Sequence, residues 1–274
     1  MTAAPPEAPA DVLIMPWERF VTWWRAQWHQ GEHVGIVGPT GSGKSTLTAG
    51  LCSVRDYVMA LNIVDDNTLD GTGWERRTKW PLPIKDRDRI KDGKPLRIIV
   101  GKHVRKRADR EANRLMLSRV MPDLWEHGNW TVVVGELQLL ADRRFYNLAD
   151  DAVEMMIAAR KRGLSVVAEL QRVAIGQSTG GASSTVGDQV TWLAVAYTRD
   201  DRMVQRLAEL LGRPAAEVRE LVRALPPYTW AIVGRDPRAP YVVTSPPEVV
   251  VPHPSAEQAP APSWRELVWG RLAG

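Results

Sequence analysis

The feature that most constrains this chain is a glycine-rich stretch near its N-terminus. Residues 33–47 read HVGIVGPTGSGKSTL, and residues 38–45 satisfy the pattern G-x-x-x-x-G-K-[ST] at every fixed position. Glycines let such a loop curl so that backbone N–H groups point inward at phosphate oxygens, and the helix that begins near Gly43 adds its positive N-terminal end. An apolar strand pattern precedes the loop and a helical pattern follows it. The sequence therefore predicts a triphosphate-binding P-loop.

The residues of this loop divide into a cradle for the phosphates and a ligand for the accompanying metal ion. Lys44 is expected to reach the β- and γ-phosphates of ATP, and the Ser45 hydroxyl to bind Mg²⁺. We therefore predict ATP and Mg²⁺ as cofactors. The predicted nucleotide-binding residues are Gly38, Pro39, Thr40, Gly41, Ser42, Gly43, Lys44, Ser45 and Thr46.

Composition is that of an ordinary globular protein. The 274 residues are 44% hydrophobic and 25% charged, which leaves room for one large α/β domain, with or without appendages. The single Cys52 permits no internal disulfide, which fits a reducing cytoplasm. Residues 1–11 have neither a basic region nor an apolar run, and no segment approaches the ~20 apolar residues of a membrane helix. We expect a cytoplasmic location and no membrane contact.

Charge is unevenly distributed along the chain. The formal net charge is +4, but residues 76–114 contain 15 Lys and Arg against 5 Asp and Glu. Such a segment suits a surface that faces a polyanion. A solvated charged face with interspersed acids would look the same, so charge alone leaves both interpretations open.

The second decisive stretch is an apolar strand with an acid at its end. Residues 131–135 read Thr-Val-Val-Val-Gly, and Glu136 follows. P-loop ATPases usually end this strand in Asp-Glu, where the Asp steadies the Mg²⁺ shell and the Glu polarises the attacking water. Glu136 stands in the water-activating position, whereas Gly135 replaces the Asp.

Polar residues also follow two other predicted strands. Asp65 and Asp66 come after the strand at 57–64, where they either help Ser45 to hold the metal or cap a turn. Gln171 comes after the buried strand at 164–168, where an ATPase reads the γ-phosphate, and we expect it to be that sensor.

Three remaining segments leave alternatives open. An aromatic stripe on the helix after Pro16 predicts packing on the sheet, which we favour over stacking of one ring on the nucleotide base. Residues 70–94 are rich in Gly, Pro and charge, with Trp74 and Trp80 among basic residues, which suits either contact with a nucleic-acid strand or backbone, or an ordered surface loop. The Pro-rich tail, with a short helix at its end, either docks on a partner protein or neighbouring subunit, or folds back on its own domain.

One block of sequence resembles a known family. It comprises residues 132–137, the helix end and strand at 158–168, and Gln171-Arg172. The block is similar to that of the FtsK/HerA family of DNA-pumping ATPases, whose members carry a strand ending in Asp-Glu, a helix ending in Arg-x-x-Gly and a strand ending in Thr-Gln-Arg. The resemblance spans roughly residues 33–245, and residues 225–233 are similar to the family's late β-hairpin. The departures are Gly135 for Asp and Leu170 for Thr.

This resemblance implies a ring-shaped homo-oligomer, usually a hexamer, that binds ATP between subunits and moves along double-stranded DNA. It also implies an arginine from a neighbouring subunit, which can raise the rate by a factor on the order of 10³–10⁵. The candidates are Arg160, Arg162 and Arg172, with Arg160 first.

The expected fold is α/β: a RecA-like P-loop NTPase with a mainly parallel central sheet flanked by helices. We expect a disordered N-terminus at 1–11, a P-loop ATPase domain at 12–245 and the Pro-rich tail at 246–274. Two rival functions stay open. One is a slow or non-hydrolysing ATP-dependent switch or scaffold in DNA transfer or phage assembly, motivated by Gly135. The other is a small-molecule kinase, although the sequence lacks the arginine-rich lid such enzymes need.

Overall fold

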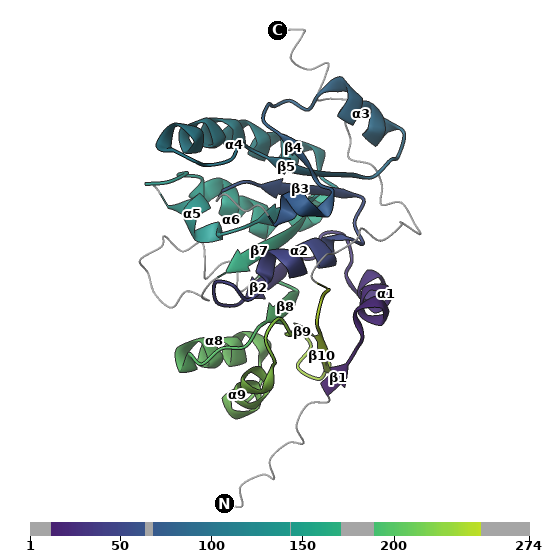
Figure 1. Ribbon diagram of the computed structural model, residues 1–274, viewed down its shortest axis with the longest axis vertical. Helices are drawn as coiled ribbons and strands as arrows, with labels where there is room; N and C mark the ends of the chain where they lie inside the picture. The colour runs from purple at the N-terminus through teal and green to yellow at the C-terminus, as the bar shows by residue number, and fades with distance from the viewer. Residues whose placement is uncertain (1–11, 64–67, 143, 171–188, 248–274) are drawn as a thin grey trace, which may run out of the picture.

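The computed structural model describes residues 12–63, 68–142, 144–170 and 189–247. In these residues ten strands form one sheet in the order β1-β10-β9-β8-β2-β7-β6-β3-β5-β4 (Figure 1). The strands are β1 (Val12–Ile14), β2 (Val34–Val37), β3 (Tyr57–Leu61), β4 (Glu75–Arg77), β5 (Leu96–Val100), β6 (Thr131–Val134), β7 (Ser165–Leu170), β8 (Trp192–Val195), β9 (Trp230–Gly234) and β10 (Tyr241–Thr244).

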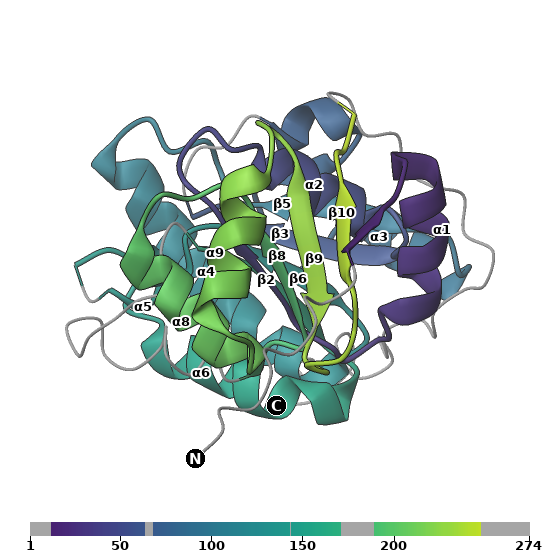
Figure 2. The ribbon, with the colours of Figure 1, turned by 90° about the horizontal axis from the view of Figure 1, so that it is seen from below.

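Helices cover both faces of this sheet (Figures 1 and 2). The described helices are α1 (Trp17–Gln27), α2 (Lys44–Cys52), η1 (Leu69–Thr72), α3 (Ile84–Lys91), α4 (Arg107–His127), α5 (Leu137–Ala141), α6 (Ala149–Ala158), η2 (Ala159–Arg162), α8 (Asp201–Leu211) and α9 (Ala215–Ala224). Buried side chains of α1 and α2 share a core with one face, and those of α4, α6 and α8 share a core with the other. None of the helices in the described part of the chain is long and apolar enough to cross a membrane.

The central strands are parallel, and the late strands are not. β4, β5, β3, β6, β7, β2 and β8 pair in parallel, whereas β8–β9 and β9–β10 are antiparallel. Parallel strands covered by helices on both faces must be apolar throughout, and the Val-rich runs of β2 and β6 meet that requirement. The expected mainly parallel α/β sheet is confirmed, and β9 and β10 form a hairpin in the closing segment.

The aromatic stripe of α1 packs on the sheet. Phe20, Trp24 and Trp28 are at most 1% exposed, and Trp24 stacks on Trp28 with ring centroids 5.2 Å apart. The Arg55 guanidinium lies 4.0 Å above the Trp28 ring and donates a hydrogen bond of 2.8 Å to the Trp28 carbonyl. The packing interpretation of this helix is therefore confirmed for its buried rings.

The segment read as a loop at 70–94 contains a strand and a helix instead. β4 forms the charged edge of the sheet, and α3 follows it. The Arg77 guanidinium joins the two elements, because it binds Glu75 at 2.6 Å and the fully buried Asp86 of α3 at 2.8 Å. Ion pairs stabilise β4 and α3, and the apolar periodicity of this segment is weak. A search for apolar periodicity therefore does not predict these two elements.

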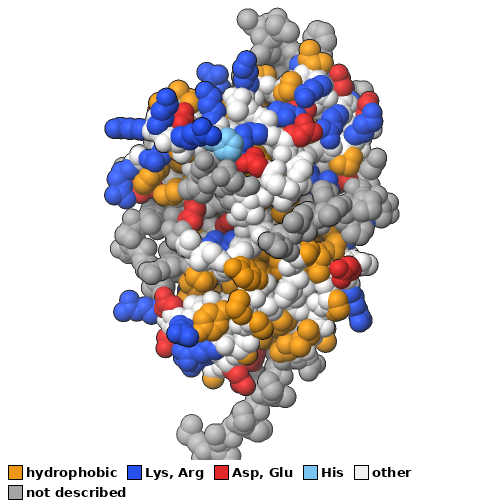
Figure 3. Space-filling view, viewed as in Figure 1, with side chains coloured by type: hydrophobic (Ala, Val, Ile, Leu, Met, Phe, Trp, Pro, Cys, Tyr) orange, Lys and Arg blue, Asp and Glu red, His pale blue; other side chains and the backbone are white. Residues whose placement is uncertain are grey.

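The basic segment is partly neutralised by the same kind of pairing. Arg76 binds Asp70 at 2.8 Å, Arg89 binds Glu75 at 2.6 Å and Arg114 binds Glu111 at 2.7 Å. Figure 3 shows Lys and Arg side chains interspersed with Asp and Glu over the region of α3 and α4. Only part of the local charge excess is therefore available to an external polyanion.

Candidate nucleotide-binding site

The P-loop joins β2 to α2 at the carboxyl end of the central strands. β2 lies between β7 and β8, with Val37 in register with Leu170 and Val195. Gly41 and Gly43 have φ values of 79° and 86°, which few residues with a side chain adopt. Gly43 caps the N-terminus of α2, so the positive end of this helix adjoins the loop.

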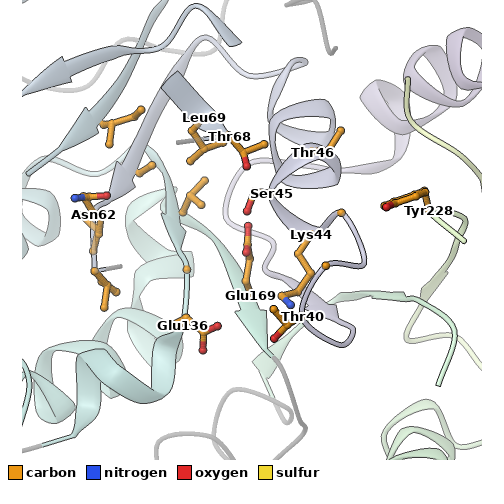
Figure 4. A pocket seen from close by; sticks show the side chains of 18 residues that line it. Thr40, Lys44, Ser45, Thr46, Asn62, Thr68, Leu69, Glu136, Glu169 and Tyr228 are labelled. Carbon is orange, nitrogen blue, oxygen red and sulfur yellow. The ribbon is translucent and has the colours of Figure 1, made fainter. Parts of the chain in front are cut away.

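A cavity of about 400 Å³ opens beside this loop (Figure 4). Its walls come from the P-loop, α2, the ends of β3 and β6, and β7. The residues that line it are Thr40, Gly41, Gly43, Lys44, Ser45, Thr46, Ala60, Leu61, Asn62, Ile63, Thr68, Leu69, Ile99, Val133, Gly135, Glu136, Glu169 and Tyr228. The structure thus brings Lys44, Ser45 and Glu136 together, as the sequence predicts.

The Lys44 side chain curls over the loop itself. Its Nζ donates hydrogen bonds to the carbonyl oxygens of Gly38 at 3.0 Å and Pro39 at 3.1 Å. Both acceptors are neutral, and an ammonium group bonds more strongly to charged oxygens than to neutral ones. Phosphate oxygens in the cavity would therefore compete well for this group.

Glu136 enters the cavity from the turn after β6. Its backbone has φ at 54°, a left-handed conformation that is uncommon for a residue with a long side chain. The neighbouring Gly135 is not held small by packing, because a Cβ added there would meet no atom within 4 Å. The cavity wall is therefore open where P-loop ATPases usually place an Asp.

Glu169 is a site residue that sequence reasoning missed. It is the fifth residue of β7, is only 8% exposed, and accepts a hydrogen bond of 2.5 Å from Thr48 Oγ1 of α2. Figure 4 shows its carboxylate pointing toward Ser45. The expected strand stopped at Ala168, which left Glu169 in a loop. The available signal was an acid in an otherwise apolar strand.

A second cavity, of about 490 Å³, adjoins the P-loop on the side of the hairpin. Its lining residues are Gly43, Thr46, Tyr228, Trp230, Pro246 and Pro247. Tyr228 is 64% exposed, and its ring stands 3.2 Å from the position that a Cβ on Gly43 would occupy. This ring, which the sequence did not single out, offers a stacking surface beside the phosphate loop.

Arg160 and Arg162 lie at the other end of the sheet. Both belong to η2, which precedes β7, whereas the P-loop follows the carboxyl end of the parallel strand β2. Arg160 is exposed and reaches Thr191, the residue before β8, at 3.4 Å. The exposed Arg162 guanidinium lies 5.7 Å from the ring centroid of Trp125. Neither residue lines the cavity of its own chain.

Several predicted residues lie outside the part of the chain that the structure describes. They are Asp65, Asp66, Gln171 and Arg172, together with residues 1–11 and 248–274. Their proposed roles remain predictions.

His33 fixes the opposite end of β2. It is 3% exposed; one ring nitrogen, Nε2, lies 3.0 Å from the Met156 carbonyl, and the other, Nδ1, accepts a hydrogen bond of 3.1 Å from the Val166 amide. Burial lowers the pKa of His33 from 6.5 to about 4, the Met156 carbonyl opposes this shift and Arg160 reinforces it. His33 is therefore neutral at pH 7 and joins α6, β2 and β7.

No protein-family model matches the sequence, and no curated protein matches it. Among solved structures, the chain is similar to the genome packaging NTPase B204 of Sulfolobus turreted icosahedral virus 2 in complex with ATP-gammaS. The TM-score is 0.54 and the identity 16%, over 80% of this chain and 100% of that chain. The same NTPase with AMPPCP gives a TM-score of 0.50 at 16% identity, over 79% and 98% of the two chains.

VirB4 of Thermoanaerobacter pseudethanolicus is similar as well. Its TM-score is 0.53 at 10% identity, over 78% of this chain and 89% of that chain. At such identities the likeness is one of fold. The expected α/β fold of a P-loop NTPase is confirmed, because the chain shares its fold with the genome packaging NTPase and with VirB4.

Proposed function

We propose that this chain is an ATP-hydrolysing motor that moves double-stranded DNA, acting as a ring-shaped homo-oligomer with Mg²⁺-ATP between its subunits. One observation carries the proposal: Lys44, Ser45 and Glu136 line a single cavity at the carboxyl end of the sheet. The fold around that cavity is shared with the whole length of a genome packaging NTPase. The FtsK/HerA-like block of the sequence supports the same function.

The residues of the cavity suit the chemistry of phosphoryl transfer. Catalysis of this reaction depends on positioning and on charge stabilisation. Lys44 and the amides at the start of α2 would neutralise the triphosphate. Glu136 would orient water for attack on the γ-phosphate. Gln171, from its position after β7, would sense that phosphate.

The oxygen donors in the cavity fit magnesium. The Ser45 hydroxyl and the carboxylates of Glu136 and Glu169 line the same space, and Mg²⁺ takes hard oxygen ligands. When bound, the ion would help to neutralise the negative charge that develops on the phosphates during transfer. Ser45 would hold it on the side of α2, with help from Asp65.

The position of η2 supports a ring. Arg160 lies at the end of the sheet opposite the P-loop, so it cannot complete the site of its own chain. In a head-to-tail contact this surface would lie against the nucleotide site of a neighbour, and contacts of that type close into a ring where the rotation allows. The exposed basic side chains of the 76–114 segment would contribute to the surface that faces DNA or the neighbouring subunit.

ATPase activity with and without duplex DNA tests the proposal. Phosphate release from ATP should rise when duplex DNA is added, and it should disappear in Lys44→Ala and Glu136→Gln. Lys44→Ala removes the phosphate cation and should also weaken ATP binding, whereas Glu136→Gln should bind ATP and fail to turn it over. A matched control is Glu154→Gln, an exposed acid of α6, which should leave the rate unchanged.

Two results would contradict the motor. Tight ATP binding by the wild-type chain without turnover, with or without DNA, would favour the ATP-dependent switch. Phosphate transfer to a small acceptor without release of inorganic phosphate would favour a kinase. Size measurement by light scattering with ATP and DNA tests the ring separately, because a chain that stays monomeric at all concentrations would rule it out.

A further inference from the structure

We infer that the Glu169 carboxylate takes the role of the acid that P-loop ATPases usually carry at the position of Gly135, and that it holds the magnesium shell of the bound nucleotide. This inference rests on the proposed nucleotide site and deepens it. It assigns the metal-facing acid to β7, one strand closer to the P-loop than the strand that usually supplies it.

The strand register places the two positions side by side. Val133 of β6 is in register with Val167 of β7, and Val134 with Ala168. One residue further along, Gly135 directly follows β6, and Glu169 is the residue of β7 at the corresponding level. Side chains at equal levels of parallel strands point to the same face, which is here the face covered by α2. The carboxylate that is missing at Gly135 is thus replaced on the adjacent strand.

A hydrogen bond from Thr48 orients the Glu169 carboxylate. Thr48 is fully buried on α2, and its hydroxyl donates a hydrogen bond of 2.5 Å to Glu169 Oε1. Ser45 precedes Thr48 by three residues, so the two hydroxyls lie on one face of the helix. Figure 4 shows the Glu169 carboxylate pointing toward Ser45. The helix that supplies the metal-binding hydroxyl therefore also orients the acid.

The burial of Glu169 argues for a function. It is 8% exposed between apolar strands, and burying a carboxylate costs desolvation energy that an apolar side chain would not. Carboxylate oxygens are ligands that Mg²⁺ prefers, directly or through its waters. A purely structural role, in which Glu169 only ties β7 to α2 through Thr48, is the alternative that an experiment must separate.

The metal dependence of nucleotide binding separates the two roles. ATPγS binding is measured by calorimetry in Mg²⁺ and in EDTA, and the affinity for Mn²⁺ in the presence of ATPγS is measured by electron paramagnetic resonance. Glu169→Gln should weaken Mn²⁺ binding at least about tenfold and should change the ATPγS affinity in EDTA less than about twofold. Glu154→Gln is the matched control.

Restoring the usual acid gives the sharpest test. A side chain at position 135 has free space, so Gly135→Asp should be tolerated. In the Glu169→Gln background, Gly135→Asp should recover most of the lost Mn²⁺ affinity. A structural tie between β7 and α2 would not be rescued in this way, because an acid placed after β6 does not restore the hydrogen bond from Thr48 to the Glu169 carboxylate.

Thr48 variants test the positioning separately and serve if Glu169→Gln does not fold. Thr48→Val should weaken Mn²⁺ binding with little change in ATPγS affinity in EDTA, whereas Thr48→Ser, which keeps the hydroxyl, should behave as wild type. Mn²⁺ affinity within about twofold of wild type in both folded Glu169→Gln and Thr48→Val would overturn the inference. A wild-type chain that binds no ATPγS at all would instead overturn the proposed function.

Discussion

Glu136 combines a proposed catalytic role with a left-handed backbone conformation. Its φ of 54° costs a residue with a side chain on the order of 1–3 kcal/mol, a cost that glycine does not incur. Glu136→Gly should therefore raise the free energy of unfolding by about 1 kcal/mol while it abolishes ATP turnover. Urea unfolding followed by circular dichroism measures the first effect and phosphate release the second.

Glu136→Gln separates the backbone from the charge. This variant keeps the side-chain shape and the left-handed backbone, so its unfolding midpoint should match that of wild type although its turnover is lost. If Glu136→Gln is stabilised as much as Glu136→Gly, the cost lies in burying the carboxylate rather than in the backbone. In that case the negative charge of Glu136 lowers the free energy of unfolding, and its left-handed backbone contributes little to this loss.

At the scale of secondary-structure elements, His33 joins two strands and a helix in its neutral form. Its folded pKa of about 4 lies below the ordinary value of 6.5, so the unfolded chain binds more protons between these values. Stability contributed by the neutral ring is therefore present above pH 6.5 and is lost as pH falls toward 4. Protonation also removes Nδ1 as acceptor for the Val166 amide.

The free energy of unfolding should fall between about pH 7 and pH 4 in both the wild-type protein and a His33→Gln variant. The fall should be larger in the wild-type protein by up to about 3 kcal/mol, because only that protein carries the titrating ring. Urea unfolding at half-unit pH steps measures the difference in slope. His33→Gln lacks the titrating group. It should be less stable than wild type at pH 7, and its free energy of unfolding should change less with pH in this range. Parallel pH profiles for the two proteins would show that His33 does not control the acid response.

The elements themselves were predictable to different degrees. The strand before the P-loop and the strand before Glu136 follow from their apolar runs, which dominate where both faces of a strand are buried. β4 and α3 were missed because Arg77 and Asp86 hold them by an ion pair, and a pairing between charged residues nine positions apart leaves no periodic signal. Local pattern therefore predicts the core of the sheet better than its charged edge.

The site was predicted as far as its residues follow a sequence motif. Lys44, Ser45 and Glu136 belong to motifs with fixed spacing, and the structure gathers them in one cavity. Glu169 and Tyr228 belong to none, because Glu169 enters the site through strand register and Tyr228 through the return of the chain just before β9. Such residues become visible only when the sheet order is known.

For the whole molecule, the separation of the P-loop and η2 to opposite ends of the sheet has a consequence that can be measured by mixing variants. If Arg160 acts on a neighbour's ATP, Lys44→Ala and Arg160→Ala should each lose turnover, the latter by a factor on the order of 10³–10⁵. A ring assembled from equal amounts of both contains interfaces in which one subunit supplies an intact Lys44 and the next an intact Arg160. Random assembly makes about a quarter of the interfaces complete in a head-to-tail ring.

The mixture should therefore recover about a quarter of the wild-type ATPase rate, whereas neither variant does so alone. Arg160→Ala mixed with the double variant Lys44→Ala/Arg160→Ala is the matched control, because none of its interfaces contains Arg160. Subunit exchange is verified by co-purification of a tagged variant with an untagged one. If subunits exchange and activity does not return, Arg160 does not complete the neighbour's site. The same mixing experiment with Arg162→Ala then decides whether η2 supplies the arginine at all.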